Sequence, residues 1–218
     1  MPSTRSTGGR AALLLPMRLI HITRIHRPIR AHRAGHYDDA MSRFRRANAG
    51  TTFFFTLVAW RRRPILCDDV IRDALRAAIH TVRQRRPFTI DAWVQLPDHL
   101  HCIWTLPSDD SDFSQRWREI KHSVSYACRD RYAPELMSSC MKRRGEAPIW
   151  QRRFWEHQIR DERDFERHVD YVHINPVRHG HVTHASLWPY SSFERYVREG
   201  LYPANWCGPA GLRELCWE

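Results

Sequence analysis

The chain has 218 residues, a length that suits one domain with a sizeable core. Its net charge of +11 and pI near 10.0 favour a polyanionic partner, and no apolar run is long enough to span a membrane. Six scattered cysteines without a Cys-x-x-Cys pair argue against a secreted disulfide framework, so we expect a cytoplasmic protein with no membrane partner.

Much of the positive charge lies in five short arginine clusters. A single cluster fits an ordinary solvated surface equally well. Five on one domain favour nucleic acid, because like charges repel unless an anion offsets them. The clusters are Arg45-Arg46, Arg61 to Arg63, Arg83 with Arg85-Arg86, Arg143-Arg144 and Arg152-Arg153.

The beginning and the end of the chain differ from its middle. Residues 1–40 are rich in Arg, His, Gly and Ser without periodicity, which predicts a disordered basic leader. Met41 opens a segment of different character, and we expect the domain to span 41–206 with a tail at 207–218. Either translation starts at Met41, or the leader is a basic arm that adds unspecific DNA affinity.

Seven elements follow in chain order. Alternating or aromatic-rich apolar runs predict strands, and apolar positions three or four apart predict helices. The elements are a strand at 51–60, a helix at 68–84 capped by Asp68 or Asp69, strands at 88–96 and 99–106 joined by a Pro97-Asp98 turn, a helix at 112–130, a strand at 154–159 and a helix at 161–174. This α+β order predicts a ferredoxin-like βαββαβ antiparallel sheet with helices on one face, plus an added helix that carries Tyr171.

Two histidines, His99 and His101, lie two positions apart on a predicted strand. Both imidazoles therefore project to one face, while Leu100 and Cys102 point away. Neutral imidazole is a common metal ligand, so the pair could share one ion. In a chain with 14 histidines the same spacing also fits two ordinary side chains, and the motif alone does not decide.

Tyr171 and Asn175 are four residues apart at the end of the last predicted helix, so they face the same side. Pro176 is expected to end that helix. The amide could serve as a third metal ligand and the phenol as a nucleophile. A half-buried packing tyrosine is the equally weighted alternative.

Three separated segments resemble a known family. Residues 96–107 (LPDHLHCIWTLP) resemble the histidine–hydrophobic–histidine segment of HUH transposases with a single tyrosine. Residues 149–157 (IWQRRFWEH) and 168–177 (HVDYVHINPV) are similar to a narrower group, the REP-associated tyrosine transposases. These are relatives of the IS200/IS605 transposases that act on hairpins in bacterial genomes. The resemblance runs from about Met41 to Trp206.

The resemblance implies a function and a site. Tyr171 is implied as the catalytic nucleophile, and His99, His101 and Asn175 as ligands of a divalent metal, Mg²⁺ or Mn²⁺. The implied reaction nicks and rejoins single-stranded DNA at REP-type hairpins through a 5′-phosphotyrosine intermediate, without ATP. Such an enzyme would be nucleoid-associated, and the hairpin-associated group resembles monomers rather than the dimers of the smaller relatives.

The resemblance also implies DNA contacts. Family members usually begin with a Tyr-Arg-Arg signature that contacts bases beside the hairpin, and here it reads Phe44-Arg45-Arg46. The lost hydroxyl removes any hydrogen bond from that position, while stacking and the arginine contacts remain. The residues expected to contact DNA are Phe44, Arg45, Arg46, Arg152, Arg153 and His157.

Two other functions share features with this sequence. A domesticated relative could bind hairpin DNA without catalysis, although the intact Tyr171 and histidines argue against this. A zinc hydrolase built on the His-x-His pair would need Asp and His soon afterwards, where Ile103 and Trp104 stand instead. The hydrolase is therefore disfavoured.

Overall fold

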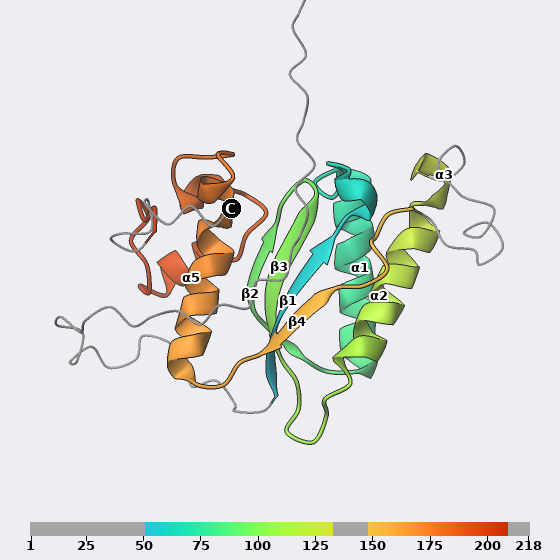
Figure 1. The fold of residues 1–218 in the computed structure, drawn as a ribbon, viewed down its shortest axis with the longest axis horizontal. Coiled ribbons are helices and arrows are strands. Elements are labelled where there is room, and N and C mark those ends of the chain that lie inside the picture. Colours follow the sequence, from blue (N-terminus) through green and yellow to red (C-terminus); the bar gives the residue numbers. More distant parts are fainter. Residues whose placement is uncertain (1–50, 133–147, 209–218) are drawn as a thin grey trace, which may run out of the picture. The chain divides into compact units, whose positions relative to one another are not determined.

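The computed structural model describes residues 51–132 and 148–208 (Figure 1). The predictions for the leader and for Phe44, Arg45 and Arg46 lie outside these residues. The strands are β1 (Thr52–Val58), β2 (Thr89–Gln95), β3 (His99–Thr105) and β4 (Trp155–Gln158). The helices are α1 (Asp69–Arg85), α2 (Phe113–Ala127), α3 (Arg129–Tyr132), α5 (Glu162–Arg178) and α6 (Phe193–Arg198), with short 3-10 turns η1 (Trp60–Arg62) and η3 (Ala185–Leu187).

The four strands form one antiparallel sheet in the order β2-β3-β1-β4. A ferredoxin-like βαββαβ chain has β1 and β3 in the centre of the sheet and β2 and β4 at its edges, so the predicted arrangement is confirmed. Each strand alternates its side chains between the two faces of the sheet. Both faces are covered, which explains why β1 and β3 are buried along almost their whole length.

One face of the sheet packs against α1 and α2 (Figure 1). Trp104 of β3 stacks on Trp117 of α2 with ring centroids 4.0 Å apart, and Phe88 lies 4.1 Å from Trp104 on its other side. These aromatic rings fill the space between the sheet and the helices. The chain has nine tryptophans, and such large apolar side chains supply much of a core.

The opposite face packs against α5, the helix that carries Tyr171 (Figure 1). Val169 and Val172 of α5 are fully buried with Ile103 of β3 in a second core. The predicted added helix therefore lies across the sheet from α1 and α2. His99 and His101 share the α5 face because they are four and two residues before Ile103 on the same strand.

The sequence missed several features of this second layer. Pro176 does not end α5, which continues to Arg178. Proline removes one backbone donor, a small loss so near the end of the helix, and the final turn closes through His179 N to Asn175 O at 3.0 Å. The short helices η3 and α6 follow without the long apolar periodicity that sequence patterns detect.

The predicted N-cap of α1 has the right residue but not the expected side-chain hydrogen bond. Asp68 occupies the N-cap position, but its side chain does not cap the helix. Its carboxylate instead accepts a hydrogen bond from the Tyr132 hydroxyl, a partner 64 residues away. Among residues 51–132 and 148–208, no helix is long and apolar enough to cross a membrane.

Candidate active site

His99 and His101 lie side by side beneath α5. Their ring centroids are 4.9 Å apart, and the residues are only 5% and 4% exposed. Their strand pairs with β1 in a register that sets Val58 opposite His99 and Thr56 opposite His101. The backbone on both sides therefore fixes the spacing of the two imidazoles.

A hydrogen bond orients each histidine through its Nδ1 atom. His101 Nδ1 lies 2.8 Å from Thr56 Oγ1, and His99 Nδ1 lies 2.6 Å from Asp98 Oδ1. Arg62 in turn donates to Asp98 at 2.8 Å. Metal-binding histidines commonly have one nitrogen held in this way while the other binds the ion. The two Nε2 atoms are therefore the ones left for a metal.

The charge state of the pair suits a ligand role. Burial, and next the neighbouring His99, lower the pKa of His101 well below its ordinary value, so the ring is neutral at physiological pH. Burial alone would raise the pKa of Asp98, but hydrogen bonds from His99 and Arg62 outweigh it and keep the carboxylate ionised. A neutral imidazole beside an oriented carboxylate is a common arrangement at metal sites.

Tyr171 stands beside this pair. Its ring centroid is 5.1 Å from that of His101 and 5.8 Å from that of Phe54, both in edge-on geometry. The side chain is nevertheless 37% exposed, and the Arg178 guanidinium lies 5.4 Å from the ring centroid. The phenol is therefore accessible beside His101 and the Arg178 guanidinium, and its role as the nucleophile stays a prediction.

Asn175 is buried one helical turn beyond Tyr171, at 1% exposure. Its amide nitrogen donates to the Tyr171 carbonyl at 3.1 Å, and only the NH₂ end of an amide can do so. The amide oxygen is thus the end left for a ligand. Whether it joins His99 and His101 on one ion stays a prediction.

His179 completes the cluster and was missed by the sequence analysis. It follows α5 and places its ring 5.0 Å from that of His99. Burial, followed by the proximity of His99, lowers the pKa of His179 to about 4. Its position four residues after Asn175 was the available signal, but the expected helix end at Pro176 concealed it.

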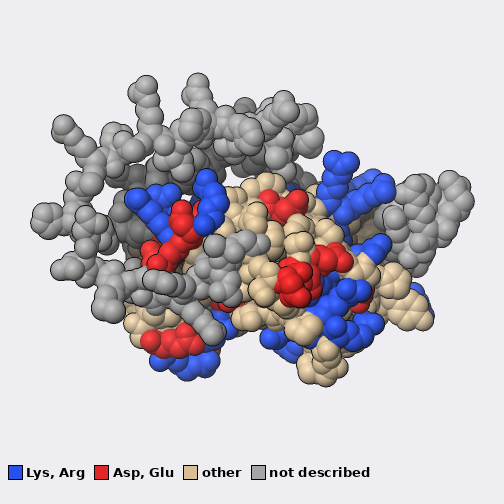
Figure 2. Space-filling view, turned by 90° about the horizontal axis from the view of Figure 1, so that it is seen from below, with Lys and Arg blue, Asp and Glu red and all other residues tan. Residues whose placement is uncertain are grey.

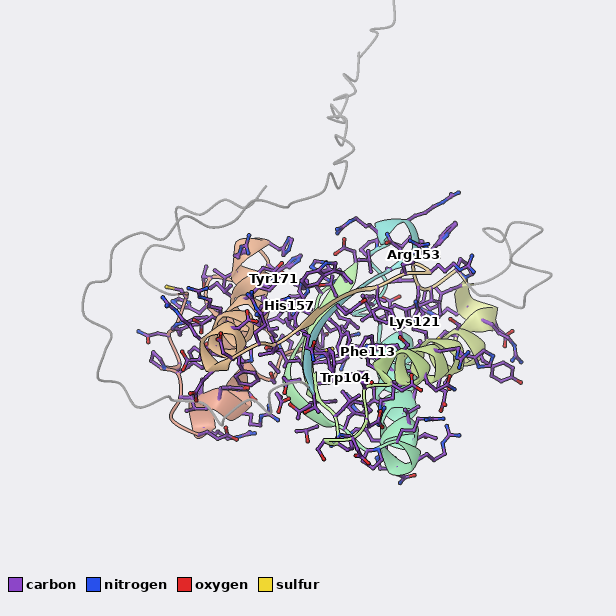
Figure 3. All side chains as sticks on the ribbon, turned by 60° about the horizontal axis from the view of Figure 1, so that its bottom comes forward. Trp104, Phe113, Lys121, Arg153, His157 and Tyr171 are labelled. Carbon is purple, nitrogen blue, oxygen red and sulfur yellow. The ribbon has the colours of Figure 1, made fainter. Side chains whose placement is uncertain are left out.

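A second group of polar residues fastens α5 to β4. Asp164 is buried in the first turn of α5 and accepts hydrogen bonds from His157 Nε2 at 2.8 Å and from the Arg160 backbone nitrogen at 3.1 Å. His168 Nδ1 donates to the Asp164 carbonyl at 2.7 Å. His157 thus faces α5 (Figure 3), and its predicted contact with DNA stays a prediction.

These three side chains could in principle hold a metal, since their ligand atoms lie within 4.8 Å of one another. Two observations instead favour a structural role, in which the three side chains form a tether that holds α5 against β4. The atoms are already joined by hydrogen bonds, and the Arg160 guanidinium, 3.3 Å from the Asp164 carboxylate, opposes a further cation. Asp164 lies seven residues before Tyr171, two helical turns along the same face, so the tether sets the position of the phenol.

Replacing Asp164 with asparagine is expected to lower the free energy of unfolding by about 2 kcal/mol at neutral pH, since it removes charge-assisted hydrogen bonds. Burial would raise the pKa of Asp164, but the His157 and Arg160 hydrogen bonds hold it below its ordinary value. Its contribution is therefore complete above the unfolded pKa of about 3.9 and is lost as the pH falls through the folded pKa.

Urea unfolding of wild type and Asp164→Asn across pH 3 to 7 checks this. The difference between the two should be constant near neutrality and shrink in acid. Asp73→Asn, which removes an exposed acid of α1, is the matched control and should change little. A difference that grows as the pH falls would contradict the assignment.

Arg152 and Arg153 lie in a bulge just before β4, where Lys121 of α2 donates hydrogen bonds to the Gln151 and Arg152 carbonyls. Gln151 N donates a hydrogen bond to Val58 O, and Trp155 is paired with Thr56. The three residues 152–154 therefore lie opposite the single residue between Thr56 and Val58, where a regular strand would have one. Both arginines are exposed, and within the described residues neither forms an ion pair. The register places them level with the β1 residues that pair with His99 and His101, and their predicted contact with DNA stays a prediction.

The other arginine clusters are partly structural. Arg85 and Arg86 both pair with Glu119, each at 3.1 Å, and Arg62 pairs with Asp98. On the face shown in Figure 2, Lys and Arg side chains form separate groups interspersed with acidic residues. The net charge of the whole chain therefore does not by itself locate a DNA-binding surface, because some of these arginines are neutralised by acidic partners.

The sheet, the paired histidines and Tyr171 all lie in the part of the chain that matches a known transposase family. Residues 50–175 match the Y1 family described as "Transposase IS200 like". A REP-associated tyrosine transposase of Escherichia coli K12 is 48% identical over 77% of this chain and 92% of its own length. A relative from Haemophilus influenzae, provisionally given the same name, is 38% identical over 79% of this chain and 97% of its own.

A solved structure supports the same grouping. The structure described as a REP-associated tyrosine transposase bound to a REP hairpin is 48% identical, with a TM-score of 0.62 over 78% of this chain and 93% of that one. The chain belongs to the IS200-like transposase family, among its REP-associated tyrosine transposases.

Proposed function

We propose that this protein nicks and rejoins single-stranded DNA at REP-type hairpins through a 5′-phosphotyrosine formed on Tyr171. The observation that carries the proposal is the 5.1 Å approach of the accessible Tyr171 ring to His101, whose Nδ1 is held by Thr56 so that Nε2 is left for a metal. The hairpin is proposed because the related solved structure holds one.

The chemistry follows from the side chains present. The Tyr171 oxygen attacks the scissile phosphorus, its proton is lost, and the bond to the leaving 3′-oxygen breaks to give a free 3′-hydroxyl. One phosphodiester is exchanged for another, so a 3′-hydroxyl can later attack the phosphotyrosine and reseal the strand without ATP. The fixed position of α5 contributes by holding the phenol in line with the leaving oxygen.

The donor set fits a divalent cation. His99 and His101 would offer their Nε2 atoms and Asn175 its amide oxygen. The bound ion, Mg²⁺ or Mn²⁺, would polarise the scissile phosphate and offset its developing charge. His179 is a neighbour of the same cluster and limits the space around His99.

The DNA strand is proposed to run along the β4 edge. Arg152 and Arg153 would bind its phosphates, and Phe44, Arg45 and Arg46 the bases beside the hairpin. Binding is therefore expected to weaken steeply with salt. Tyr171 stands beside the histidines of its own chain, which supports a monomer that completes its own site.

The deciding experiment incubates the wild-type protein with a labelled single-stranded oligonucleotide that carries the REP hairpin flanking the gene. Mn²⁺, Mg²⁺ and EDTA are compared on a denaturing protein gel. A covalent protein–DNA band that needs the metal is the expected result. Tight hairpin binding without a band in any metal would favour the alternative, a domesticated binding protein without catalysis.

A further inference from the structure

Trp155, the first residue of β4, is a large aromatic side chain left in the open. It is 55% exposed, although tryptophan usually buries most of its ring because the apolar area is so large. Its strand pairs it with Thr56, so it lies on the sheet face that carries His101 and α5. The exposed ring therefore belongs to the side of the sheet where Tyr171 stands.

Trp155 and Tyr171 flank the same buried ring. Phe54 meets Trp155 edge-on at 5.6 Å between centroids and Tyr171 edge-on at 5.8 Å. Phe54 itself is only 3% exposed and serves as the floor between them. A strand that delivers a phosphate to Tyr171 would thus bring a neighbouring nucleotide over Trp155.

The orientation of the indole is held in advance. Its plane is within 4° of the His157 ring at 6.0 Å, and His157 is fixed by its hydrogen bond to Asp164. His157 in turn stacks on His168 at 4.7 Å. Trp155 is thus the exposed end of a row of nearly parallel rings, and little entropy is lost when a flat ligand joins it.

The other exposed apolar side chains of the described residues lack this setting. Tyr126 of α2 is 64% exposed and lies against Arg129, on a helix that packs on the opposite face of the sheet. Apart from Tyr171 itself, Trp155 is the one exposed aromatic side chain of the described residues that contacts Phe54, the floor of the site. Arg152 and Arg153 precede it by three and two residues and add positive charge for the phosphates.

We infer that Trp155 is a stacking platform for one unpaired base next to the scissile phosphate. The inference rests on the proposed function and specifies how its DNA strand is held. Every base offers a π-face, so the platform fixes the position of the strand rather than reading its sequence. Loss of the platform is expected to weaken binding between about 5-fold and about 150-fold, the range measured for single base–aromatic stacks.

An abasic scan tests the inference. The Tyr171→Phe variant is used so that the DNA is not cleaved during the titration. It is titrated with labelled REP-hairpin oligonucleotides in which one unpaired nucleotide at a time lacks its base. One position near the cleavage site should weaken binding at least about 5-fold. In Tyr171→Phe with Trp155→Ala the same missing base should cost less than about 2-fold, because its partner is already gone.

The controls separate stacking from folding and from catalysis. Trp155→Phe should restore most of the affinity, whereas Tyr126→Ala should leave it unchanged, with melting temperatures compared for all variants. An abasic penalty that stays the same with and without Trp155 would overturn the inference. A wild type that makes no adduct, combined with a Trp155-dependent penalty, would overturn the proposed cleavage and leave the platform standing.

Discussion

Replacing Tyr171 with phenylalanine is expected to abolish the covalent protein–DNA adduct and to slow hairpin cleavage by at least about 10³-fold. The ring keeps its edge contacts with His101 and Phe54, so only the oxygen that attacks phosphorus is lost. Hairpin affinity should stay within about 2-fold of wild type. Single-turnover cleavage and anisotropy titrations with the same oligonucleotide measure the two effects.

The matched control is Tyr126→Phe, which removes a phenolic oxygen far from the site on the opposite layer. It should leave the adduct intact. If Tyr171→Phe still forms a full yield of adduct, another residue is the nucleophile and the assignment of Tyr171 fails.

Replacing His101 with alanine is expected to reduce metal-dependent cleavage by about 10³-fold or more, since one of the two imidazole donors of the proposed metal site is removed. A graded variant is available in Thr56→Val, which keeps the imidazole but removes the 2.8 Å hydrogen bond that orients it. Loss of such an orienting partner typically weakens metal binding about 10- to 100-fold.

The two variants should respond differently to added metal. Raising Mn²⁺ should restore the Thr56→Val rate, because its ligand set is complete, and should fail to restore His101→Ala. Direct Mn²⁺ binding, followed without DNA, gives an independent readout. Equal metal affinity in wild type and His101→Ala would remove His101 from the metal site.

Much of the fold was predictable from local patterns. Period-two alternation located β2 and β3, and period-three-to-four spacing located α1, α2 and α5, because each element buries one face. The His-x-His pair and the Tyr171–Asn175 spacing also follow from local geometry. The sequence could therefore state which side chains share a face before any tertiary contact was known.

Other parts of the site depend on contacts between distant segments. The edge bulge that presents Arg152 and Arg153 exists only because β4 pairs with β1, about 100 residues earlier in the chain. The tether between Asp164 and His157 joins a helix to a strand through side chains that look like ordinary surface residues. No periodic pattern marks such pairs, so a sequence gives no signal for them.

The sequence by itself determined the strand and helix order, the basic charge and the residues that resemble the family's site. Only the tertiary structure decided that α5 covers the sheet face opposite α1 and α2, that it runs past Pro176, and that His179 meets His99. The physical reason is the range of the interactions. Periodicity and turn chemistry act within a few residues, whereas which face a helix covers is settled by burial shared among segments far apart in the chain.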